Sequence, residues 1–396
     1  MSSTVKKKRK TKKNKELSPI LLPSPESTPN PSLPDDLLIS CFARVSRLYY
    51  PTLSFVSKSF GSLIASPELY KTRSLLNRTE SCLYVYLRFH PDPTPYWYTL
   101  CRRPNPNITN DISIRKNKKK PCGYVLAAIQ APHSPPAPPA HWAGLVSVGS
   151  NIYNIGGPIV DKEASSRVSI LDCRSQTWLE GPKMQVERKY PAANVIDGKI
   201  YVVGGCKDCD KSNWMEVFDT KTQVWELVSS PGAKICGDSI HKSAVIDEKV
   251  YVFGNCNGLA LKPKDGTWQR VGWEMESGWA WYSYNVIGNV LYYYNDGGFK
   301  WYDTKVRVWR NLMGVKGLPR LPNYIARLAD HGGKMAVLWD RKVPSSEDKK
   351  KTIWCAVIAL ERRNNDEEIW GKVEWYDAVL AVPESCRIEY AISATL

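Results

Sequence analysis

The chain has 396 residues, of which 43% are hydrophobic and 24% charged, enough for about two or three folded domains. The formal net charge is +16, but residues 1–30 carry eight basic and only two acidic side chains, so the remainder need not have a uniformly cationic surface. The longest uninterrupted apolar stretch, Ile353–Leu360, has eight residues, too few for a membrane-spanning helix, so we do not expect a transmembrane protein.

The N-terminal sequence and the cysteines bear on cellular compartment. Met1–Val5 runs directly into basic residues instead of an apolar segment, so we expect no secretory signal. The eleven cysteines are scattered through a chain too long for a disulfide-dense small fold, and we expect reduced thiols. These observations predict a protein of the nucleus and/or the cytoplasm.

Residues 1–30 consist largely of Lys, Ser, Pro and Thr, and they predict a disordered basic tail because they offer almost nothing to bury. A cluster with the composition of short nuclear-import signals is formed by Lys6, Lys7, Lys8, Arg9 and Lys10. The alternative is a solvated charge run that contacts nucleic acid loosely. No nucleic-acid-binding module is recognisable, so we do not expect specific nucleic-acid binding.

Residues 31–76 have the apolar periodicity of a small all-α unit of three helices. Pro34, followed by two acidic residues, favours the start of the first helix. Pro51 can open the second, whose apolar stripe runs to Leu63, and Pro67 can open a short third helix. A unit this small cannot bury its apolar faces alone, and exposed apolar surface of this kind indicates a partner.

The runs Leu33–Val45 and Leu53–Ile64 resemble an F-box, which in that family docks on a Skp-type adaptor held by a cullin scaffold. Departures from the family pattern are Ser46 in place of a second Pro, Phe60 in place of the common Trp, and Cys41-Phe42 in place of Ile-Leu. The resemblance implies adaptor docking through Leu33, Pro34, Leu37, Leu38, Phe42, Val56, Phe60 and Leu63. The alternative is a helical hairpin that caps the next domain.

After the helices the pattern changes to short alternating segments typical of strands, and beyond residue 141 a unit recurs. Ile-Tyr followed by Gly156-Gly157 returns before Gly204-Gly205, and related segments precede Asn255 and Asn295, with spacings of 48, 50 and 40 residues. A Trp follows each unit, at positions 178, 225, 268 and 309. The copies lie near residues 141–188, 189–236, 237–277, 278–321 and 322–375, and residues 81–105 form a partial copy.

One small sheet cannot bury both of its faces, so the copies must stack on one another, and radial stacking protects their edges. A repeat of this length with Gly turns and a packing Trp resembles the kelch family. The resemblance implies a mainly β fold over residues 77–396, a kelch β-propeller with six blades. The partial copy lacks an inner strand, and we expect the C-terminal segment Cys386–Ile392 to supply it.

No catalytic, cofactor or metal site is expected. An oxidase on such a propeller would need a Tyr–Cys pair and two His near the axis, whereas the five His are each isolated. Cys206-Lys-Asp-Cys209 is the only CxxC, without the second pair that a structural zinc site commonly uses, so we interpret it as a surface loop with reduced thiols.

Together the two resemblances imply a plant-type F-box/kelch-repeat protein: the non-catalytic substrate-recognition subunit of an SCF-type ubiquitin ligase, whose propeller binds an unknown target protein. A kelch scaffold outside any ligase is the alternative, and an oxidase or carbohydrate-binding propeller is a minor one. The aromatic residues Trp279, Trp281, Tyr282 and Tyr284 are candidates for the target surface, or else for packing between blades.

Overall fold

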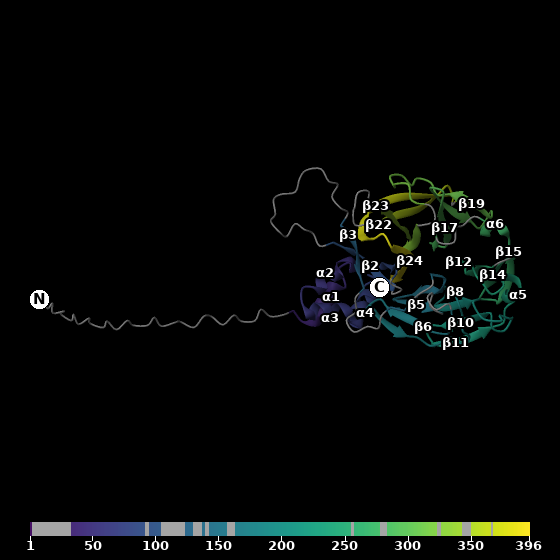
Figure 1. The fold of residues 1–396 in the computed structure, drawn as a ribbon, viewed down its shortest axis with the longest axis horizontal. Helices are drawn as coiled ribbons and strands as arrows, with labels where there is room; N and C mark the ends of the chain where they lie inside the picture. Colours follow the sequence, from purple (N-terminus) through teal and green to yellow (C-terminus); the bar gives the residue numbers. More distant parts are fainter. Residues whose placement is uncertain are drawn as a thin grey trace.

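A computed structural model gives the structure of the chain (Figure 1). It describes residues 1, 33–91, 95–103, 123–129, 137–138, 142–156, 163–254, 257–277, 283–322, 326–342, 350–365 and 367–396. The expected basic tail, including Lys6–Lys10, lies outside these residues.

Short helices precede the first strand. They are α1 (Asp35–Phe42), the 3₁₀ turn η1 (Arg47–Tyr49), α2 (Tyr50–Ser54), α3 (Lys58–Ala65) and α4 (Pro67–Leu75). The expected start at Pro34 is confirmed, with two acidic residues in the first turn of α1. Ser66 accepts a hydrogen bond from the backbone N of Leu69 and caps α4, which has Pro at its first position.

The helix expected from Pro51 to Leu63 is divided into α2 and α3. Ser57 has an extended backbone, and its side chain accepts a hydrogen bond from the backbone N of Phe60 at 3.1 Å. A serine that caps the following helix in this way ends the preceding one, because the cap residue itself is not helical. The described helical region therefore contains four α-helices rather than the three that periodicity predicts.

After these helices the described chain forms six four-stranded sheets, with short helices and loops between them. In the first five, strands follow chain order from the inside of the ring outwards: β4–β7 (Leu145–Val148, Asn151–Ile155, Val168–Asp172, Thr177–Glu180), β8–β11 (Ala192–Ile196, Lys199–Val203, Met215–Asp219, Val224–Val228), β12–β15 (Lys242–Ile246, Lys249–Phe253, Gly258–Lys262, Thr267–Val271), β16–β19 (Tyr284–Ile287, Val290–Asn295, Gly298–Asp303, Val308–Asn311) and β20–β23 (Arg327–His331, Lys334–Lys342, Lys350–Arg363, Glu368–Pro383). The short helices α5 (Gly232–Cys236) and α6 (Trp273–Glu276) and the 3₁₀ turn η3 (Trp142–Gly144) lie between sheets or before them. Figure 1 shows the sheets arranged radially, which confirms the expected six-bladed propeller.

The sixth sheet joins sequence from both ends of the propeller. Its order is β24 (Cys386–Thr395), β1 (Ser81–Phe89), β2 (Pro95–Arg102) and β3 (Tyr124–Ala128). The antiparallel register between β24 and β1 runs from the pair Ser81 and Thr395 to the pair Phe89 and Cys386. This pairing closes the ring and leaves β1 hydrogen-bonded on both sides.

The tryptophans of the repeat pack within and between sheets. Trp178 on β7 is 8% exposed and lies against Trp97 of the sixth sheet, with ring centroids 5.9 Å apart. Trp225 on β11 is also buried and contacts Phe218 of its own sheet, with centroids 4.8 Å apart. The pair of Trp97 and Trp178 holds one blade against the next, and the pair of Phe218 and Trp225 packs within a blade; each ring buries on the order of 150–250 Å².

Glycine is required at the turn after the second strand of the repeat. Gly205 has a φ of +72°, and a Cβ there would collide with the backbone of Lys189 from the preceding inter-blade loop. Positive φ is accessible to glycine without a steric penalty, which explains the recurrent Gly pair.

Candidate functional site: the helical face and the loop end of the propeller

The residues expected to dock an adaptor fall into three environments. Leu33, Leu37 and Val56 are exposed, with 57%, 49% and 64% of their surface accessible. Pro34 is also exposed, while Leu38 and Phe60 are half-buried. Phe42 and Leu63 are buried in the core that the helices share with the propeller. The exposed members can contact a partner directly, whereas the buried ones fix the helices that present them.

Phe42 shows this supporting role. Its ring meets the edge of Phe60, with centroids 4.9 Å apart, and so joins α1 to α3. The hydroxyl of Tyr50 donates a hydrogen bond to the carbonyl of Phe42 at 2.9 Å. These contacts set the orientation of the helix that carries Leu37.

Sequence periodicity missed further exposed apolar residues on the same helices. Phe55 is 88% exposed and Leu75 is 75% exposed. Phe55 precedes Val56 in the connection between α2 and α3, and both side chains are exposed there. An unbroken helix would have placed only Val56 on the apolar stripe. The capping serine at position 57, with Phe three residues later, was the sequence feature that could have indicated the break.

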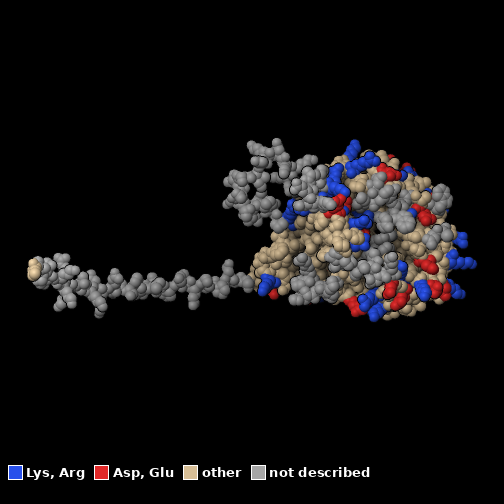
Figure 2. Space-filling view, in the orientation of Figure 1, with Lys and Arg blue, Asp and Glu red and all other residues tan. Residues whose placement is uncertain are grey.

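The propeller does not cover this face. In the view of Figure 2 the surface over the helices carries few charged side chains, whereas both basic and acidic side chains are spread over the propeller. We name the exposed large hydrophobic residues of the helical region the helical face; it consists of Leu33, Leu37, Tyr49, Phe55, Val56, Leu75 and Leu76. Exposed apolar side chains gathered on one part of a fold are typical of interaction surfaces.

Arg47 connects the helices to the ring. Its guanidinium donates hydrogen bonds to the hydroxyl of Tyr70 on α4 and, at 2.6 Å, to the carbonyl of Cys173 in the turn between β6 and β7. The hydroxyl of Tyr84 on β1 donates to the same carbonyl at 3.2 Å. Burial raises the pKa of Tyr70 to about 12, so this hydroxyl stays protonated at physiological pH.

Arg73 forms a second connection. Its guanidinium donates to the carbonyl of Val45 at 2.8 Å and to the hydroxyl of Tyr50 at 3.0 Å, and it forms an ion pair with Glu80 at 3.3 Å. Glu80 in turn exchanges two backbone hydrogen bonds with Leu396, the residue after β24. Arg73 thus ties parts of the helical region to one another, and its ion pair with Glu80 links them to the start of β1 and to the C-terminus.

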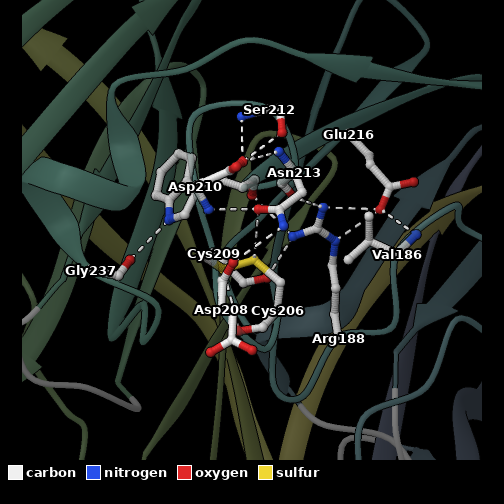
Figure 3. The surroundings of a disulfide bond; sticks show 12 residues. Val186, Arg188, Cys206, Asp208, Cys209, Asp210, Ser212, Asn213, Glu216 and Gly237 are labelled. Carbon is white, nitrogen blue, oxygen red and sulfur yellow. Dashed lines mark hydrogen bonds and ion pairs between the residues drawn. A yellow bond between two sulfur atoms is a disulfide. The ribbon is translucent and has the colours of Figure 1, made fainter.

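The helices therefore contact one end of the blades, because Cys173 lies in a turn between a third and a fourth strand. The loops that join second to third strands leave from the opposite end. One of these, residues 204–214 between β9 and β10, is drawn in Figure 3. We name this side of the ring the loop end.

The loop end corrects one expectation. Cys206 and Cys209 form a disulfide instead of a pair of reduced thiols, because the tight loop brings their Cα atoms to 5.3 Å (Figure 3). In the same loop Asp210 accepts hydrogen bonds from the backbone N of Ser212 and Asn213. The loop is thus ordered by a covalent bond and by its own polar side chains.

A buried ion pair lies beneath that loop. Arg188 and Glu216 both have 0% side-chain exposure, and the Arg188 guanidinium meets Glu216 Oε1 at 2.9 Å (Figure 3). Arg188 also donates to the carbonyls of Gly204, Asn213 and Trp214 at 2.7–3.0 Å. Burial lowers the pKa of Arg188, and the Glu216 carboxylate opposes that shift.

Of the four aromatic residues expected at a target surface, only Tyr284 lies in the described part of the chain. Trp279, Trp281 and Tyr282 lie outside the described residues. Tyr284 lies on the inner strand β16, where its hydroxyl donates to the carbonyl of Ser243 on the neighbouring inner strand at 3.1 Å. Tyr284 therefore packs between blades.

The described residues give no support for the oxidase alternative. No group of three or more His, Cys, Asp or Glu side chains within this part of the chain could hold a metal ion. His331 is partly buried at the end of β20, and burial lowers its pKa. None of the described helices is long and apolar enough to cross a bilayer.

Comparison with known proteins agrees with the two-part architecture. A family model described as an F-box domain matches residues 31–72, and a model described as FKB95, Kelch-repeats domain matches residues 97–380. The F-box/kelch-repeat protein At4g39550 of Arabidopsis thaliana is 64% identical over the full length of both chains. The Arabidopsis F-box/kelch-repeat proteins At4g39580 and At5g49000 are 52% and 53% identical, each over 95% of this chain and over 96% and 97% of their own. The chain therefore belongs to the plant F-box/kelch-repeat family.

Proposed function

We propose that this chain is a substrate adaptor of an SCF-type ubiquitin ligase, because an F-box joined to a kelch propeller fits that role. The chain binds a Skp-type adaptor, and through it a cullin, by the helical face, and its propeller binds a target protein for ubiquitination. The chain itself forms no covalent bond in this scheme. The observation that carries the proposal is the uncovered helical face, where Phe55 is 88% exposed beside Val56.

The fixed connection between helices and ring supports this function physically. A ligase subunit accelerates transfer by holding the target near the charged conjugating enzyme, which raises the effective concentration of the two reactants. Arg47 holds the helices against the propeller by a buried hydrogen bond to Cys173, and Arg73 pairs with Glu80 just before β1, so a target on the ring would keep a defined distance from the adaptor. The loop end, opposite the helices, is the side left open for that target.

The test is the affinity of the full chain for a purified Skp-type adaptor, measured by calorimetry. Replacing Leu37 and Val56 together by Ala should weaken binding by roughly 2–4 kcal/mol, the scale of truncating two central interface residues. Leu179→Ala is the matched control, because Leu179 on β7 is 54% exposed but lies on the propeller. It should bind the adaptor as the unmodified chain does.

Equal affinities of the double variant and the control would contradict docking by the helical face. Co-purification from plant cells separates a ligase subunit from a scaffold outside any ligase, since only the former should recover adaptor and cullin in stoichiometric amounts.

We propose that the protein is located in the nucleus and/or the cytoplasm. A fluorescent fusion that loses nuclear signal when Lys6–Lys10 are replaced by Ala would support import by the basic cluster.

A further inference from the structure

A groove lies between two neighbouring blades, the sheets β8–β11 and β12–β15. Its volume is about 740 Å³, within the range of about 300–1,000 Å³ in which proteins commonly hold ligands. Residues 209–211 of the disulfide loop line it, together with Asn257 and Arg270 of the next blade. The rest of the lining comes from residues 230–235, which belong to the link between β11 and β12. We name this space the loop-end groove.

The groove lies on the side of the ring opposite the helices. Neighbouring strands in each blade are antiparallel, so the second and fourth strands end on the same side. The link after β11 and the end of β15, where Arg270 lies, are therefore on the same side as the loop between β9 and β10. This is the loop end, the side on which a target would bind.

Internal contacts hold the lining of the groove in place. The disulfide shown in Figure 3 closes the loop that carries Lys211. The backbone N of Ser230 donates to the carbonyl of Lys211 at 2.8 Å, which joins this loop to the link before α5. Gly232 packs so closely on the buried ring of Trp214 that a Cβ would collide with it. A site that is formed before binding loses less conformational entropy when the partner arrives.

Positive charge is in excess along the groove. Lys211, Lys234 and Arg270 are exposed, and none of their side chains forms an ion pair or a hydrogen bond within the described part of the chain. Among the lining residues only Asp210 is acidic, and its Oδ1 already accepts from the backbone N and the hydroxyl of Ser212 at 2.7 and 2.6 Å. An anionic partner would therefore compensate the charge of the lining.

Apolar side chains share the lining with these cations. Pro231 is exposed, and Ala233 and Ile235 are half-buried. They offer contact area to aliphatic groups, while the cations offer charge-assisted hydrogen bonds to carboxylates. A nucleic acid fits this surface less well, because the lining contains no aromatic side chain on which a base could stack.

We propose that the loop-end groove binds an extended segment of the target protein that combines Asp or Glu with aliphatic side chains. The carboxylates pair with Lys211, Lys234 and Arg270, and the aliphatic groups pack on the link between β11 and β12. This inference rests on the proposed function, because it names the chemistry of the target that the propeller presents to the ligase.

The test measures binding of short synthetic peptides to the full-length chain by fluorescence anisotropy. One pool mixes Asp and Glu with Leu, Val and Pro, and matched pools carry Asn and Gln, Lys, or phosphoserine in place of the acidic residues. A single-stranded RNA oligonucleotide is a further probe. We expect binding by the acidic pool and none by the Asn/Gln and Lys pools.

The groove variant replaces Lys211, Lys234 and Arg270 together by Gln and should weaken binding of the acidic peptides about tenfold or more. Its matched control replaces Lys221, Lys264 and Lys305 by Gln. These are also exposed, but they lie in turns between third and fourth strands at the opposite end of the ring. The control loses the same amount of charge and should bind the acidic peptides as the unmodified chain does.

Both variants should keep the melting temperature of the unmodified chain, because the replaced side chains are exposed and unpaired within the described residues. If the triple groove variant does not fold, Lys234→Gln alone should still weaken binding, by a smaller factor. Three results would overturn the proposal: no binding by the acidic pool, equal weakening in the groove and control variants, or tighter binding of the phosphoserine pool or the RNA. Adaptor affinity, expected to be unchanged in the groove variant, tests the proposed function separately.

Discussion

Removing the carboxylate of Glu216 should be among the most damaging single changes in the propeller. Glu216→Ala leaves the Arg188 guanidinium buried without its counterion, since both side chains have 0% exposure. It also removes the acceptor for the backbone N of Gln185 at 2.7 Å and of Val186 at 3.2 Å. Breaking one side of a buried ion pair costs about 3–5 kcal/mol of unfolding free energy.

Urea unfolding followed by tryptophan fluorescence measures this loss. The slope is about 1–3 kcal/mol per molar urea for small proteins and is steeper for a chain of 396 residues, so the midpoint should fall by about 0.5 M or more. Glu216→Gln keeps one acceptor oxygen and should give a smaller fall. The matched control is Asp265→Ala, which breaks the exposed pair between Lys262 and Asp265 and should hardly move the midpoint. If Glu216→Ala shifted the midpoint no further than this control, the reasoning about the buried pair would be refuted.

Two further predictions concern ring closure and the thiols. Deleting residues 385–396 removes β24 and leaves β1 with an unpaired edge, so the melting temperature should fall sharply. Deleting residues 1–30 is the control and should leave the melting temperature unchanged. An unchanged melting temperature of the first variant would contradict closure by β24. Iodoacetamide at pH 8, followed by peptide mass spectrometry, should label exposed Cys41 far faster than Cys101 and Cys173, because burial shields both thiols and raises their pKa to about 12. Equal labelling of all three would show that the buried thiols are reached by solvent.

The blade pattern could be predicted because each copy repeats the same local requirements. Gly156, Gly204 and Gly205 have positive φ after the second strands of two blades, and the repeat Trp packs on aromatic rings in several blades, so the sequence carries these residue types at regular intervals. The outer strand β3 was missed because Tyr124–Ala128 lies beyond the expected limit of residue 105. Nothing in the local pattern ties such a distant segment to β2.

Features built from long-range contacts could not be predicted. Arg188 and Glu216 are 28 residues apart, and only the folded blade shows that they meet in a buried pair. The helical region gives a related case, since a regular apolar stripe predicted one helix where the cap at Ser57 made two. Phe55 became visible as part of the helical face only after that break was known.

The closure by β24 has a consequence for the newly made chain. The helices and β1 emerge from the ribosome first, but the strand that completes their sheet emerges after every other blade. Until then, the inner edge of β1 is open, and Glu80 lacks the two backbone hydrogen bonds it exchanges with Leu396. A nascent or prematurely ended polypeptide would thus carry its helices beside an incomplete sixth sheet, and only translation through β24 supplies the strand and the Leu396 contacts that complete it.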